Sequence, residues 1–122
     1  AIARAAGGEE PFSGMARRLA VRKGGAIVYA PVDEVSYVAG ADDYSELHMT
    51  DGGSMLCDKR LAALERILPA TFARVHRSYI ANLEHVRALR VTNGRPTLVM
   101  LDGAAIPIGR RYGKALRARL EG

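Results

Sequence analysis

Alternating apolar and polar residues dominate this chain from residue 17 onward. The stretch 17–23 alternates through Leu19 and Val21, and the stretch 44–49 alternates again. A period of two is typical of strands that bury one face. Further strands are expected at 26–30, 35–38, 54–57, 86–92, 97–101 and 104–108.

Short glycine-containing turns separate many of these strands. The turn residues are Gly24-Gly25, Asp51-Gly52-Gly53, Asn93-Gly94 and Asp102-Gly103. An Asn-Gly pair between two strands is a strong signal for a type I′ hairpin. Pro96 stands near the start of the second strand of that hairpin, which predicts that this strand lies at a sheet edge.

Two segments have helical spacing instead. The stretch 59–68 is predicted to be a helix that Asp58 caps and Pro69 ends. Its apolar stripe is Leu61, Leu64 and Leu68. The closing stretch, 109–122, is predicted to be a second helix, with an apolar stripe made by Tyr112, Leu116 and Leu120. The fold class that follows is mainly β, with short antiparallel strands, tight turns and one or two short helices.

The length of 122 residues fits one ordinary domain with a tail. Residues 1–15 are rich in Ala and Gly and lack a period, so we interpret them as an interdomain linker and residues 16–122 as the folded domain. A chain that begins at Ala1 rather than Met suggests a fragment of a longer protein. Of 18 basic residues, 15 are Arg, and the net charge of +5 favours an anionic partner.

The cysteine and hydrophobic content indicates a cytoplasmic protein. Cys57 is alone, so no internal disulfide can form, and we expect it to be a small buried apolar residue. No apolar run approaches the roughly 20 residues of a membrane helix, and no signal peptide is visible. The three histidines and Cys57 lack metal-ligand spacing, so no metal or cofactor is expected.

The densest polar cluster lies between the Leu-rich stretch and the Asn-Gly hairpin. It comprises Arg74, His76, Arg77, Ser78, Tyr79 and Asn82. Arg can bind guanine edges, Ser can bind phosphate oxygens, and His can do either. Residue types alone favour a polar loop whose side chains bind local backbone groups.

Two further clusters have similar alternatives. Arg110-Arg111 stands at the predicted start of the last helix, where bases face either phosphate or solvent. Asp42-Asp43-Tyr44 lies between two predicted strands and forms either a base-contacting loop or a surface turn. A hydrolase based on His76 and Ser78 lacks a recognisable nucleophile motif, so no enzymatic activity is expected. A nucleotide-binding domain and a protein-interaction module with a basic face remain alternatives.

Several of these motifs, in this order, resemble the LytTR family of bacterial DNA-binding domains. The matching stretches are Val35-Ser36-Tyr37-Val38, Asp43-Tyr44, the Leu-rich helix, 72–82 and Ile106-Pro107-Ile108-Gly109-Arg110-Arg111. The resemblance covers roughly 17–121. It departs from the family at Gly109, where Ser is frequent, and at Ala81, where Val is favoured.

The resemblance implies an elongated fold of three small antiparallel sheets. It also implies an output domain of a two-component response regulator, placed after a receiver domain of the phosphorelay. Such domains bind promoter DNA as dimers on direct repeats, with loops in successive major grooves.

The family's base contacts correspond here to Arg77, Arg111 and one residue among Asp43, Tyr44 and Ser45. His76 and Ser78 would support the loop or contact phosphate. The full candidate set is Asp43, Tyr44, Ser45, Arg74, His76, Arg77, Ser78, Asn82, Arg110 and Arg111.

Overall fold

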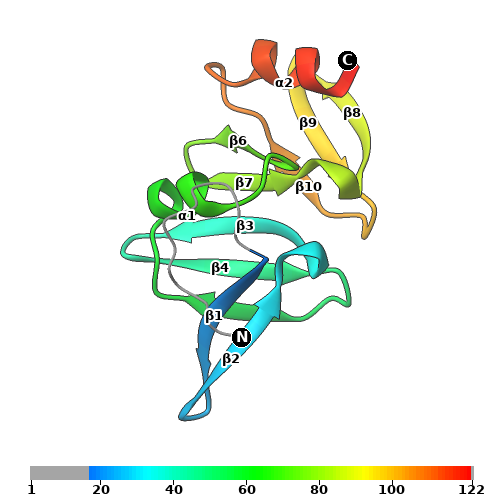
Figure 1. Cartoon of the computed structure of the whole chain (residues 1–122). Coiled ribbons are helices and arrows are strands. Elements are labelled where there is room, and N and C mark those ends of the chain that lie inside the picture. Colours follow the sequence, from blue (N-terminus) through cyan, green and yellow to red (C-terminus); the bar gives the residue numbers. More distant parts are fainter. Residues whose placement is uncertain (1–16, 122) are drawn as a thin grey trace.

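A computed structural model of the chain describes residues 17–121. Within that range the strands form three antiparallel sheets, accompanied by two short α-helices (Figure 1). The mainly β fold class expected from the sequence is therefore confirmed. The predicted linker, residues 1–15, lies outside the described residues.

The first sheet is the hairpin of β1 (Arg18–Lys23) and β2 (Ala26–Pro31). Its turn is Gly24-Gly25, and both glycines have positive φ, 57° and 82°. Glycine adopts this backbone conformation without strain because it has no Cβ, whereas other residues are strained in it. The hairpin turn expected from the sequence is thus confirmed.

The central sheet has five strands in the order β5-β4-β3-β7-β6. These strands are β3 (Val35–Ala41), β4 (Tyr44–Met49), β5 (Ser54–Cys57), β6 (Phe72–His76) and β7 (Tyr79–Asn82). A short 3₁₀ helix, Val32–Glu34, leads into β3. The pairing of β3 with β7 joins two distant parts of the chain and brings their turns to one edge.

The third sheet has the order β10-β9-β8, built from β8 (Val86–Thr92), β9 (Arg95–Met100) and β10 (Ala105–Pro107). A second 3₁₀ helix, Leu83–His85, precedes β8. Asn93 and Gly94 both have positive φ, as a type I′ hairpin requires.

The prediction of an edge strand at Pro96 is wrong, because β9 is the middle strand. The pairing of β9 with β10 ends at Thr97 opposite Pro107, one residue after the proline. The Pro96 carbonyl accepts from Ile108 N on that side, at 3.3 Å. The nitrogen and carbonyl of one strand residue point the same way, so the missing N–H falls beyond the paired part of β10.

The helices are shorter than predicted. Helix α1 spans Leu61–Ile67 and follows Arg60, which makes no side-chain cap. The expected cap by Asp58 is therefore wrong, since Asp58 lies two residues too early. Helix α2 spans Gly113–Glu121, so Arg110 and Arg111 occupy the turn before the helix rather than its first turn.

Two hydrophobic cores hold the sheets together. One lies between the β1–β2 hairpin, the central sheet and α1, and includes all three leucines of the predicted stripe together with buried Cys57. The other lies between the central sheet, the three-stranded sheet and α2, around Val75, Leu98 and Leu116. Because β6 and β7 contribute to both cores, the β6–β7 turn is held from two sides.

Candidate nucleic-acid interface

The β3–β4 turn presents two carboxylates and one aromatic ring. Asp42 has a positive φ of 55°, and Asp43 is exposed and paired with Arg60 of the segment before α1. Tyr44 is 43% exposed. Ser45 is fully buried, and its hydroxyl donates to the Lys59 carbonyl at 2.6 Å. Ser45 therefore fixes the start of α1 against this turn.

The β6–β7 turn is shaped by Arg74, whose side chain is only 17% exposed. Its Nε donates to the His76 carbonyl at 2.8 Å, and Nη1 donates to Glu65 Oε1 at 2.9 Å. Nη2 donates to the Arg77 carbonyl. A planar guanidinium directs its N–H donors from three nitrogens in a fixed fork, whereas a lysine donates from a single nitrogen. Arg74 is thus occupied within the protein and holds the turn in shape.

The same turn orients His76 and Arg77. Nδ1 of His76 accepts the backbone N–H of Ser78 at 3.0 Å. A nitrogen that accepts a hydrogen bond carries no proton, so the proton of the neutral ring is on Nε2. The ring also packs edge-on against Tyr79, with 5.6 Å between centroids. Arg77 stands between these residues at the tip of the turn, with its side chain exposed.

The β10–α2 turn is tied to the same edge. Gly109 N donates to the Val75 carbonyl at 2.8 Å, and the Gly109 carbonyl accepts from Tyr112 N at 3.0 Å. A Cβ at Gly109 would lie 3.5 Å from the His76 Cα. The exposed pair Arg110-Arg111 follows immediately, so these two arginines lie beside the β6–β7 turn.

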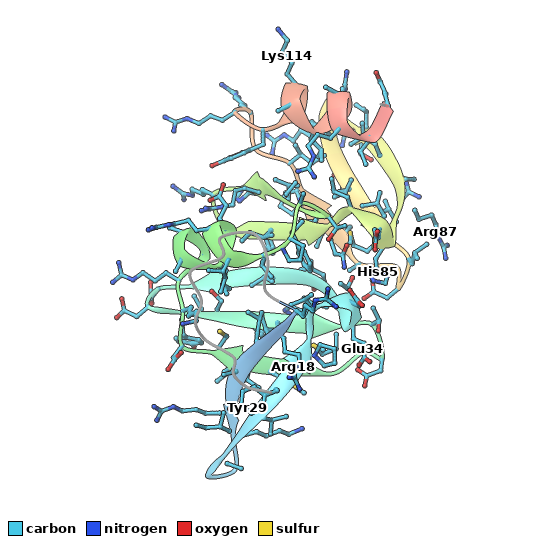
Figure 2. All side chains as sticks on the ribbon, viewed as in Figure 1. Arg18, Tyr29, Glu34, His85, Arg87 and Lys114 are labelled. Atoms are coloured by element: carbon cyan, nitrogen blue, oxygen red, sulfur yellow. The ribbon has the colours of Figure 1, made fainter. Side chains whose placement is uncertain are left out.

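Three turns from distant parts of the sequence therefore share one edge of the molecule. Figure 1 shows the β3–β4, β6–β7 and β10–α2 turns one above another on the left, with α1 among them. Side chains tipped with nitrogen project from this edge in Figure 2. The Ser78 carbonyl accepts from Gly40 N at 2.8 Å, which links the first two turns directly.

A shallow hollow of about 280 Å³ separates the β3–β4 turn, the start of α1 and the β6–β7 turn. Its lining includes Asp42, Arg60, Arg74, Arg77 and Ser78. Arg60 is paired with Asp43 and Arg74 with Glu65, so Arg77 is the lining guanidinium that makes no ion pair among the described residues and can face an anion. We call this edge, with the three turns and the hollow, the turn edge.

The structure brings most of the predicted site residues together, although not in equivalent positions. The exposed ones on the turn edge are Asp43, Tyr44, Arg77, Arg110 and Arg111, and the partly buried ones are His76 and Ser78. Asn82 lies inside the protein, where Nδ2 donates to the Val35 carbonyl at 3.0 Å and Oδ1 accepts from Glu84 N at 3.1 Å. Ser45 and Asn82 thus bind backbone groups of their own chain.

Arg60 is a member of the turn edge that the sequence analysis did not single out. Its guanidinium contacts Asp43 and lines the hollow. The available signal was the basic pair Lys59-Arg60 ahead of the Leu-rich helix. Nothing local to that pair indicates that the β3–β4 turn lies beside it.

Among the described residues there is little support for a metal site, a membrane-spanning helix or a reactive thiol. Across residues 17–121, no three His, Cys, Asp or Glu side chains lie close enough to hold a metal ion. No helix in the described part of the chain is both long and apolar enough to cross a membrane. Burial raises the pKa of the Cys57 thiol, which disfavours the reactive thiolate.

The arginine-bearing turns on one edge of this small β domain form a surface of the kind that DNA-binding domains present to phosphates and bases. Residues 25–121 match the profile of the LytTr DNA-binding domain, and the chain belongs to this family. The family consists of DNA-binding domains of transcriptional regulators and not of enzymes. The family resemblance inferred from the sequence motifs is thereby confirmed.

Two curated relatives match over most of this chain. It is 40% identical over 110 residues to the CO-responsive transcriptional regulator RcoM of Rhodospirillum rubrum, covering 88% of this chain and 46% of RcoM. It is 31% identical over 105 residues to the sensory transduction protein LytT of Bacillus subtilis, covering 84% of this chain and 43% of LytT. The chain thus spans less than half the length of these relatives.

The fold is similar to a solved structure, the LytTr DNA-binding domain of a putative methyl-accepting/DNA response regulator from Bacillus cereus. The TM-score is 0.76 at 24% sequence identity, over 88% of this chain and 98% of that one. At this identity the likeness concerns the fold.

Proposed function

We propose that this domain binds double-stranded promoter DNA sequence-specifically by placing the turns of the turn edge in successive major grooves. The observation that carries the proposal is that Arg77 and Arg111, from turns far apart in sequence, are exposed on the same edge. A guanidinium can donate two hydrogen bonds to guanine O6 and N7. Phosphate contacts would fix the register of the domain on the duplex.

The buried members of the candidate set take a supporting role in this proposal. Arg74 holds the β6–β7 turn, Ser45 holds the β3–β4 turn to the start of α1, and Asn82 joins β7 to the start of β3. His76 presents Nε2–H to a phosphate oxygen while its Nδ1 is engaged with Ser78 N. From the β3–β4 turn, Tyr44 contacts a base or the sugar-phosphate backbone, whereas Asp43, whose charge repels phosphate, pairs with Arg60.

We further infer that the domain is the output module of a longer, cytoplasmic regulator. The relatives are more than twice as long as the segment they share with this chain, and one carries the name of a sensory transduction protein. An upstream receiver domain and a homodimer on direct repeats complete this proposal. Sequencing the coding region upstream of Ala1 tests the receiver domain, since a receiver must carry a phosphoacceptor aspartate.

Selection of bound duplexes from a randomised pool, at two salt concentrations, tests DNA recognition. We expect a short motif repeated about one helical turn apart, as two copies in successive major grooves require. On the selected duplex, Arg77→Ala should cost about 1–3 kcal/mol and relax the preference at one base pair. Binding that fades with salt and enriches no motif would contradict sequence recognition and favour an acidic protein as the partner of the basic edge.

A further inference from the structure

A second hollow lies at the end of the sheets opposite the turn edge. It has a volume of about 200 Å³ and is lined by Ser36, Thr50, His85, Leu101 and Asp102. Ser36 and Thr50 belong to the central sheet and its β4–β5 turn, whereas the other three belong to the second 3₁₀ helix and the β9–β10 turn. Figure 2 labels His85 above Glu34 in this region, to the right. We call it the rear hollow.

The rear hollow contains a polar group that lacks a partner. Ser36 is 1% exposed, and its Oγ has no hydrogen-bond partner among the described residues. A buried hydroxyl that makes no hydrogen bond costs about 1–3 kcal/mol. Ser36 also lines the hollow, so a molecule seated there lies next to the residue whose hydroxyl lacks a partner.

The fixed polar groups of the rear hollow are hydrogen-bond acceptors. Nε2 of His85 lies 2.8 Å from the Asp33 carbonyl, which can only accept, so Nε2 carries the proton and Nδ1 of the neutral ring is an acceptor. One carboxylate oxygen of Asp102 accepts from Ala104 N at 3.0 Å, which leaves the other oxygen for a ligand. The hydroxyls of Ser36 and Thr50 can rotate to accept as well.

The charge around the rear hollow is mainly negative. Asp33 and Glu34 lie on the 3₁₀ helix beside it, and Asp102 forms part of its wall. The basic group nearby, Arg87, donates to the Leu101 carbonyl at 3.1 Å and projects outward in Figure 2. Burial, and after it the negative charge of Asp102, raise the pKa of Tyr37.

We propose that the rear hollow binds the head group of an organic cation that carries N–H donors, either a primary ammonium or a guanidinium. Such a group donates N–H hydrogen bonds to acceptors of Ser36, His85 and Asp102, and its positive charge offsets that of the carboxylate. A metal ion fits less well, because no three ligating side chains converge in the described residues. The volume suits a head group rather than a whole drug-sized molecule. This inference is independent of the proposed DNA binding.

Amide NMR of the ¹⁵N-labelled chain tests the site with methylguanidinium and ethylammonium as probes. Tetramethylammonium at the same ionic strength is the control, because it has the charge without N–H donors. We expect saturable shifts of the Ser36, Thr50 and Asp102 amides with both probes and none with the control. Shifts that do not saturate, or equal shifts with tetramethylammonium, would overturn the proposal.

Two conservative variants locate the binding. Ser36→Ala removes the unpartnered hydroxyl, and Asp102→Asn removes the charge while keeping the acceptor for Ala104 N. Each should weaken probe binding at least five-fold, whereas Ser54→Ala, at an exposed serine of β5, should leave it unchanged. If Ser36→Ala binds the probes as tightly as the native chain, the hollow holds only an ordered water and the proposal fails.

Varying the protein concentration distinguishes two sources of the cation, a second copy of the chain and a free small molecule. A basic side chain of a second copy would shift the same amides as protein concentration rises without any probe. That result supports the chemistry and assigns the donor to the protein itself. Shifts that depend on the probe alone support a free small molecule.

Discussion

A variant of Arg74 tests whether this residue shapes the β6–β7 turn or contacts DNA. Its guanidinium is 17% exposed and donates to Glu65 and to the His76 and Arg77 carbonyls. Arg74→Met keeps most of the packing and removes all three hydrogen bonds. Hydrogen bonds of charged groups contribute about 1.5–3 kcal/mol each when buried.

The three bonds do not add in full, because Glu65 is about half exposed and the carbonyls regain water in the variant. We therefore expect Arg74→Met to lower the free energy of unfolding by about 2–3 kcal/mol. Urea denaturation measures this loss as a lower midpoint at an unchanged slope. Affinity for the selected duplex should fall about ten-fold, because the β6–β7 turn is no longer fixed.

The salt dependence of DNA binding separates the two roles. A lost phosphate contact lowers the slope of log K against log salt by about one. Arg74→Met should leave that slope unchanged. Arg77→Met is the matched control, since the same change at the exposed tip of the turn should preserve stability and reduce recognition. Native stability with a slope reduced by one in Arg74→Met would refute the reasoning and make Arg74 a phosphate contact.

Three further predictions concern the turn edge and the core. Asp43→Asn should tighten duplex binding about two- to five-fold at low salt, because it removes a carboxylate and releases Arg60; weaker binding in a titration would instead mean that Asp43 accepts from a base. Gly40→Ala should lower the free energy of unfolding by about 1–3 kcal/mol, measured as a lower urea midpoint, because its Cβ would lie 2.9 Å from Leu61 Cδ1. An unchanged midpoint would show that the leucine side chain moves aside at no cost. Burial raises the pKa of Cys57, so its contribution to stability is present below the unfolded thiol pKa of about 8.5 and is lost as pH rises above it. Cys57→Ala should therefore show a smaller alkaline loss of stability, and identical pH curves would contradict this.

The sequence predicted best those hairpins whose turn conformation is determined by the residue types of the turn itself. Gly24-Gly25 and Asn93-Gly94 adopt positive φ, which their residue types favour in any context. The β6–β7 hairpin was expected only as a polar cluster, because its turn contains neither Gly nor Asn. Its turn is closed by the Arg74 guanidinium and by His76 Nδ1, and both contacts depend on the folded arrangement.

Composition and family motifs predicted which residues make up the candidate site, but not the role of each residue. The motifs gave the residues Arg77 and Arg111, and the structure places both at one edge. Whether a polar side chain faces outward depends on the strand order, which pairs β3 with β7. That pairing buries Asn82 against Val35. The pairing of β4 with β5, with Ser45 opposite Cys57, places Arg60 beside Asp43, which residue spacing does not indicate.

The most direct test of the account is a map of the DNA contact on the protein. Amide shifts of the ¹⁵N-labelled chain are compared with and without the selected duplex. We predict that the largest changes fall at residues 42–44, 76–78 and 109–111, together along the turn edge. Changes concentrated instead on the β1–β2 hairpin or around the rear hollow, with these three turns unaffected, would contradict the proposed interface.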